Sequence, residues 1–249
     1  MRIDFYYWGM QCPIIYEMQN LINEYNSKFD IYLHDISNDF SMAEKQKMFF
    51  PFLTVIEGRT RYRGPIKRSI LENLLNGRAI VEKPYIIPLA TKIYEGEIIP
   101  LTKNNISLVS SGCTLTQCKE ACNKKGAFLA EYCEDIFGFI NVKDNRVLGG
   151  AEYVPSINVP YKIPKDIDTA FLTCLYHSST EYDYKSAPLN ALEKYLKTKG
   201  YLKIIAITDE VGTFPNGNLD WFLKHGYNNE RVISVEEDYC VLHLVSKTL

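Results

Sequence analysis

The most informative segment of this 249-residue chain is N-L-D-W-F-L-K-H-G-Y, residues 218–227. It predicts a short helix over 218–224, which ends at Gly226 because glycine readily adopts the backbone conformation that follows a helix. Two strands, 232–235 and 239–245, are predicted after it. The carboxyl end of the chain is therefore a short helix followed by two strands.

The sequence between residues 97 and 217 alternates strand and helix signals. An amphipathic helix is predicted over 189–199, with Leu189, Leu192 and Leu196 on one side and Gly200 at its end. The other predicted elements are strands at 97–101, 139–143, 147–154, 170–177 and 204–208, and helical stretches at 118–125 and 128–136.

This β-α-α-β-β-β-α-β-α-β-β order, over roughly residues 97–247, resembles the GNAT acetyltransferases. That family writes residues 218–227 as N-x-x-F-Y-x-K-x-G-F, and a second similar piece is Cys174-Leu175-Tyr176-His177. The strongest resemblance is to a bacterial subgroup, the YoaP-like proteins. It implies transfer of an acetyl group from acetyl-CoA to a small amine or a protein amine.

The resemblance also implies a coenzyme site. The family binds the pyrophosphate with [QR]-x-x-G-x-[GA] before a helix, where backbone N–H groups and the helix dipole attract anions. Here Ser186 and Pro188 replace both glycines, Asp183 opposes phosphate, and Lys185 is expected to compensate. The implied coenzyme-binding residues are Leu175, Tyr176, His177, Lys185, Ser186, Ala187, Pro188, Leu189, Asn218 and Phe222.

Catalysis is expected at Tyr176 and His177, where a backbone N–H would polarise the thioester carbonyl. His177 is a candidate general base, or simply a polar residue at a strand end. Phe222 stands where the family often has a tyrosine that protonates the leaving thiolate. Three carboxylates, Glu131, Glu134 and Glu152, either bind the amine or lie on solvated faces.

Residues 1–77 show the order β-α-β-α-β-β-α, which resembles the thioredoxin and glutaredoxin-like domains. Trp8-Gly9-Met10-Gln11-Cys12-Pro13 lies where those families carry W-C-x-x-C, and Phe50-Pro51 lies where they keep a cis-proline. Gly9 replaces the attacking cysteine, so a dithiol cycle is not expected. The domain is either a monothiol or partner-binding platform, or a fold kept for packing or recognition.

The fold class is therefore α/β (α+β), with a thioredoxin-like domain at 1–77 and a GNAT-like mixed-sheet domain at 97–249. Between them, residues 78–96 contain Pro84, Pro88 and Gly96 and indicate a linker or a docked strand.

Composition excludes several classes of protein. The formal net charge of −2, from 28 basic and 30 acidic residues, does not suit a nucleic-acid binder. The chain lacks a signal-like or membrane-spanning apolar run, so we expect a cytoplasmic protein with reduced thiols. The spacing of Cys113, Cys118, Cys122 and Cys133 matches no zinc finger, and no metal is expected.

Three functions remain open from the sequence. The first is acetyl transfer, and the second is a non-catalytic binding protein with a decayed coenzyme loop. The third, a redox or metal-handling role, is disfavoured by the cysteine spacing.

Overall fold

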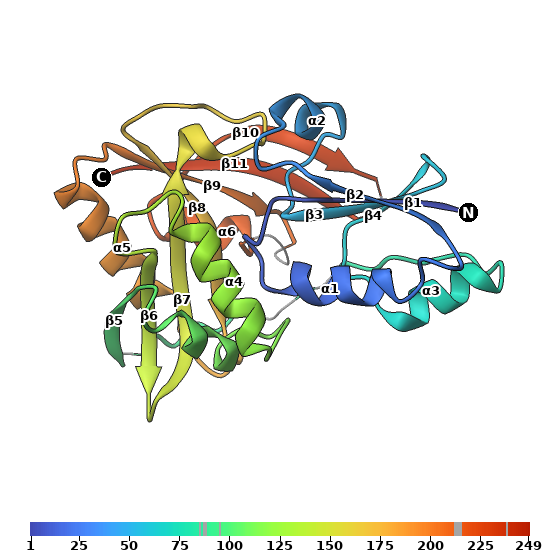
Figure 1. Cartoon of the computed structure of the whole chain (residues 1–249). Coiled ribbons are helices and arrows are strands. Elements are labelled where there is room, and N and C mark those ends of the chain that lie inside the picture. Colours follow the sequence, from blue (N-terminus) through green and yellow to red (C-terminus); the bar gives the residue numbers. More distant parts are fainter. Residues whose placement is uncertain (85, 87–88, 95, 212–215, 238) are drawn as a thin grey trace.

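The structure is a computed structural model, which describes residues 1–84, 86, 89–94, 96–211, 216–237 and 239–249. Two mixed sheets lie side by side, one formed by the first part of the chain and one by the second (Figure 1). Among the described residues, no helix combines the length and the apolar character that crossing a membrane requires.

The first sheet has four strands in the order β2-β1-β3-β4, with β1 and β2 parallel and the other neighbours antiparallel. The predicted order of elements is confirmed, and Gly77 follows the last helix with φ +65°. The elements are β1 (Arg2–Tyr7), α1 (Ile14–Asn23), β2 (Asp30–Asp35), α2 (Phe40–Lys45), β3 (Phe52–Ile56), β4 (Thr60–Tyr62) and α3 (Arg68–Leu75).

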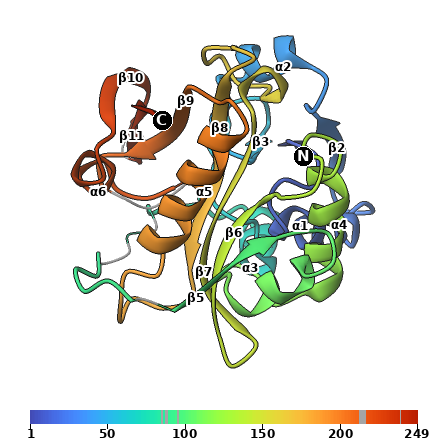
Figure 2. The same ribbon diagram turned by 90° about the vertical axis from the view of Figure 1, so that its left-hand side faces the viewer.

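Within the described residues, the second sheet has seven strands in the order β10-β11-β9-β8-β7-β6-β5, and only β8 and β9 are parallel neighbours. Helix α5 packs across β5, β6 and β7 (Figure 2). The elements are β5 (Glu97–Leu101), η1 (Ile106–Ser111), α4 (Lys119–Leu129), β6 (Gly138–Lys143), β7 (Arg146–Pro155), η2 (Ser156–Asn158), β8 (Thr169–His177), α5 (Ser186–Thr198), β9 (Lys203–Asp209), α6 (Leu219–Lys224), β10 (Asn228–Glu236) and β11 (Cys240–Thr248).

One sequence-based prediction of a helix is wrong. The helix predicted over 128–136 does not form, because α4 ends at Leu129 and Phe137, a buried core residue, donates its N–H to the carbonyl of Leu101 on β5. Helix α2 is capped by Asp39, since the Asp39 carboxylate accepts the Met42 N–H at 2.9 Å. The short 3₁₀ helix η1 was not predicted.

β8 and β9 diverge soon after they begin to pair. Their parallel pairing runs only from Thr169 to Phe171 on β8, against Lys203 to Ile205 on β9. Asn216 bridges the narrow end of the gap, because its Nδ2 donates to the carbonyls of Leu172 (3.3 Å) and Ile207 (3.0 Å). The rest of β8 therefore has one backbone edge that β9 does not cover.

The turn after β1 is buried against the second sheet. The Trp8 ring packs edge-on against Phe128 and Tyr161, with ring centroids 5.8 and 5.3 Å away. Gln11 also contacts the second sheet, where its Nε2 donates to the Thr173 carbonyl on β8 at 2.9 Å. Residues of both parts of the chain consequently share one hydrophobic core, while a second core lies mainly within residues 1–77.

The connection between the two parts is held at two places. Arg63 of the first part bridges Glu82 in the connection and Glu236 on β10. Further along, Ile93 forms a parallel bridge with Asp183, and the Asp183 N–H donates to the Lys92 carbonyl at 2.9 Å. Residues 92–94 are therefore bound to the loop that precedes α5.

Candidate functional site

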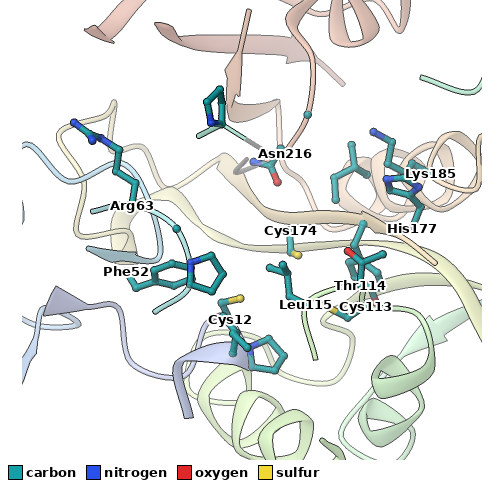
Figure 3. Close-up of a pocket in the computed structure, with 18 of the residues that line it drawn as sticks. Cys12, Phe52, Arg63, Cys113, Thr114, Leu115, Cys174, His177, Lys185 and Asn216 are labelled. Atoms are coloured by element: carbon teal, nitrogen blue, oxygen red, sulfur yellow. The ribbon is translucent and has the colours of Figure 1, made fainter. Parts of the chain in front are cut away.

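A cavity of about 530 Å³ lies between the turn after β1 and the open edge of β8. Cys12 and Phe52 line it from the first part of the chain, and Cys174, His177 and Lys185 from the second (Figure 3). Its lining is mostly apolar, with a few polar groups, as is usual for sites that bind small molecules.

The wall formed by β8 is irregular. A register shift pairs Cys174 with Glu152 and Leu172 with Tyr153, so Thr173 has no partner residue on β7. Its carbonyl is the group that accepts the Gln11 amide. Such a bulge redirects the backbone, and it places the strand end Cys174–His177 along the cavity.

The structure brings some of the predicted site residues together and separates others. Leu175, Tyr176, His177 and Lys185 all line the cavity. By contrast, five predicted residues do not line the cavity. Four of them lie in the first turn of α5 and the fifth is the N-cap of α6: Ser186, Ala187, Pro188, Leu189 and Asn218.

Phe222 is also away from the cavity. It is fully buried, with its ring centroid 5.2 Å from Trp221 and 5.0 Å from Tyr227. Asn218 caps α6, its Oδ1 accepting the Asp220 N–H at 2.8 Å. The motif 218–227 therefore contributes mainly the packing and capping of α6.

His177 is half-buried at the end of β8. Its Nδ1 lies 2.5 Å from the Ser179 carbonyl, which can only accept, so Nδ1 carries the proton and Nε2 holds a lone pair. Burial lowers the pKa of His177 below its ordinary value, and Lys185 lowers it further, against the opposing effect of the Ser179 carbonyl. A neutral imidazole at pH 7 can accept a proton from a bound amine.

Tyr176 lies beside a buried ion pair. The Lys125 ammonium on α4 is 2.5 Å from the Glu152 carboxylate on β7, and the two side chains are 1% and 0% exposed. Lys125 Nζ also lies 5.8 Å from the centre of the Tyr176 ring. Burial, and next the Glu152 charge, raise the pKa of Tyr176 well above its ordinary value, so its hydroxyl keeps its proton.

Glu152 does not lie on a solvated face, and that alternative is wrong for this residue. Glu131 and Glu134 are exposed, as the solvated alternative predicts, although they follow the end of α4 and do not lie on a helix. The role of Lys125 was missed, although its neighbours on α4 gave a signal. Ala121, Cys122 and Leu129 share the buried side of that helix, and a lysine among them needs a buried partner.

Asp183 occupies the N-terminus of α5. Its Oδ1 accepts the N–H groups of Lys185 (2.9 Å) and Ser186 (3.0 Å), and its Oδ2 accepts the Ser186 hydroxyl (2.6 Å) and the Trp221 indole N–H (2.9 Å). Burial works to raise the pKa of Asp183, but these donors outweigh it and hold the pKa below its ordinary value. Asp183 thus takes the donors that the sequence suggested for phosphate.

Lys185 is buried rather than exposed. Its Nζ lies 4.5 Å from the centre of the Trp221 ring. Burial lowers its pKa to about 8, although the Asp183 charge acts in the opposite direction. Within the described part of the chain, the ammonium has neither a hydrogen-bond acceptor nor a carboxylate at ion-pair distance.

The cysteines do not form a metal centre among the described residues. All seven have free thiols, and Cys118 is the N-cap of α4, with its Sγ accepting the Ala121 N–H at 3.5 Å. Burial raises the pKa of Cys12 to about 12, which leaves this cavity-lining thiol protonated and unreactive near neutral pH.

No protein-family model matches the chain. No curated protein matches its sequence either. Among solved structures, it resembles an N-acetyltransferase from Staphylococcus aureus Mu50, with 15% identity over 62% of this chain and 99% of that one, at a TM-score of 0.44. A PaiA N-acetyltransferase from Thermoplasma acidophilum, in complex with coenzyme A, shows 16% identity over 63% and 100% of the chains, at 0.44.

The aminoglycoside 6′-N-acetyltransferase from Enterococcus faecium is similar to the same extent, with 16% identity over 61% of this chain and 96% of that one, at a TM-score of 0.43. These neighbours are acetyltransferases. At such identities and TM-scores, the likeness does not place this chain in a family.

Proposed function

We propose that this protein is an acetyl-CoA-dependent N-acetyltransferase of the GNAT type. The observation that carries the proposal is the gap between β8 and β9, whose pairing ends at Phe171. The gap leaves one backbone edge of β8 open beside the cavity. An extended thioester arm with amide groups can lie along such an edge, as a peptide adds to a sheet.

The chemistry follows from the groups at this edge. A neutral amine attacks the thioester carbonyl, a C–N bond forms, and the C–S bond breaks to give an amide and a thiol. Backbone N–H groups of β8 stabilise the oxyanion, and His177 Nε2 takes the ammonium proton before attack. The leaving thiolate needs little assistance, because a thiol is a good leaving group. Tyr176 keeps its proton and lines the cavity, so it is the candidate proton donor to the leaving thiolate.

Residues 1–77 form a thioredoxin-like domain in this proposal, joined through 78–96 to the catalytic domain 97–249. The domain packs against the catalytic part instead of exchanging disulfides. Trp8, Gly9 and Gln11 sit in the interface, and Cys12 faces the cavity. The acceptor is a small amine or a protein amine in a cytoplasmic setting, and the arrangement belongs with the YoaP-like subgroup.

The experiment that tests this proposal is a calorimetric titration of the full chain with acetyl-CoA. An assay of thiol release in the presence of a panel of amines follows it. The proposal expects saturable binding, together with stabilisation against heat that grows with ligand concentration. The proposal fails if millimolar acetyl-CoA neither binds nor shifts the unfolding temperature.

The second candidate, a non-catalytic binding protein, is favoured by one specific observation. Asp183 fills the helix N-terminus, where the resemblance implies a coenzyme pyrophosphate. That candidate gains support if thioesters bind but no amine in the panel is acetylated.

A further inference from the structure

The first turn of α5 offers little to a pyrophosphate. The N–H groups of Lys185 and Ser186 are bonded to the Asp183 carboxylate, and residue 188 is proline, which has no N–H. The Leu189 N–H is bonded to the Lys185 carbonyl within the helix. The Asp183 carboxylate already lies at this helix end, and its negative charge repels a second anion.

One of the cations that line the cavity, Lys185, lies directly before that helix. Lys185 is 7% exposed and lines the cavity near the end of β8 (Figure 3), and its Nζ lies 4.5 Å from the centre of the Trp221 ring. A Cβ atom added at Gly217 would lie 3.2 Å from this Nζ, so glycine keeps open the space next to the ammonium. Because a buried ammonium with no carboxylate at ion-pair distance is costly, the position favours a ligand that carries an anion.

This inference rests on the proposed function. We infer that the acetyl donor is recognised as a 4′-phosphopantetheine thioester whose one phosphate binds Lys185, and that the adenosine 3′,5′-bisphosphate half of coenzyme A adds little to binding. The pantetheine arm lies along β8, and the phosphate emerges at Lys185, near the start of α5. Coenzyme A and the prosthetic group of an acyl carrier protein both present this chemistry.

The test measures dissociation constants of the full chain for acetyl-CoA, acetyl-4′-phosphopantetheine and acetyl-pantetheine. The first two are expected to agree within about threefold, and acetyl-pantetheine, which lacks the phosphate, to bind about tenfold more weakly. Adenosine 3′,5′-bisphosphate is expected not to compete. A preference for acetyl-CoA over acetyl-4′-phosphopantetheine of about 30-fold or more overturns the inference.

Two variants locate the phosphate. In Lys185→Met, acetyl-4′-phosphopantetheine and acetyl-pantetheine are expected to bind alike, and Lys185→Gln is the alternative if that variant does not fold. Lys224→Met, on the exposed side of α6, is the matched control and should keep the difference. A phosphate preference that survives both Lys185 variants refutes the assignment.

Comparing acetyl transfer from acetyl-CoA with transfer from an acetylated carrier protein identifies which of the two molecules supplies the pantetheine arm. Use of either one supports the inference and identifies the natural donor. Failure of the proposed function looks different: either none of the three thioesters binds, or they bind and no amine in the panel is acetylated from either donor.

Discussion

The backbone at Gly9 lies directly against the ring of Phe128: a Cβ atom added at Gly9 would meet Phe128 Cε2 at 2.5 Å. Gly9 also has φ +44°, a conformation that other residues adopt only with strain. The position where the thioredoxin resemblance implies an attacking cysteine is therefore a docking contact with α4. Glycine at this site serves the interface between the two parts of the chain.

Replacing Gly9 with alanine is expected to destabilise the protein by about 2–4 kcal/mol, from overpacking against Phe128 and backbone strain together. Gly58→Ala is the matched control, because Gly58 has φ +66° but no atom within 4 Å of an added Cβ. Denaturant unfolding measures both. Equal losses for the two variants would show that the Phe128 contact does not constrain residue 9.

Lys125→Met and Glu152→Gln are each expected to lower the free energy of unfolding by about 3–5 kcal/mol. Each substitution breaks the Lys125–Glu152 pair and leaves the remaining buried polar group without its partner. The double variant should recover a large part of the loss. Chemical denaturation of the four proteins gives the coupling energy. Additive losses would mean that the two charges act independently.

His177→Gln is expected to lower kcat by about 100-fold or more if His177 accepts the amine proton, with a smaller effect on donor binding. Burial lowers the pKa of His177 below its ordinary value of 6.5. The acidic limb of the wild-type rate profile should accordingly lie below pH 6.5 and vanish in the variant. A variant with the same profile would remove His177 from the mechanism.

Donor affinity is expected to fall as pH rises above about 8, because the pKa of Lys185 is lowered to about 8 and only its protonated form attracts phosphate. The titratable groups around it are Asp183 in the preceding loop, His177 at the end of β8 and His225, which stacks on Trp221. Asp183 stays ionised and His177 stays neutral in this range, because the pKa of each lies below its ordinary value. Acetyl-pantetheine should show no such fall, and a parallel fall for both thioesters would contradict this reading.

The sequence predicted the strands and the motif segments well, because their apolar patterns and glycine stops act locally. Gly226 ends α6 with φ +81°, and Asp144 and Asn145 form the turn between β6 and β7 with positive φ, as their residue types favour. The missed helix end at Leu129 depends on a distant partner, since Phe137 must pair with β5. Local propensity cannot supply that information.

The candidate site was predicted only in part for the same reason. Tyr176, His177 and Lys185 were identified from their place in a motif, and all three line the cavity. Whether Asp183 would repel a ligand or bond the chain's own N–H groups depended on its geometry. The contribution of Gln11 required the packing of residues 162 positions apart, which no spacing pattern reveals.

Hydrogen exchange of the full chain, with and without saturating acetyl-CoA, tests whether the acetyl donor binds between β8 and β9. A thioester arm paired with the open edge of β8 should slow exchange of the amides in Thr173–His177, while β2, on the outer edge of the first sheet, stays unchanged. Protection confined to other segments, or no protection at millimolar acetyl-CoA, would contradict an acetyl-donor site between β8 and β9.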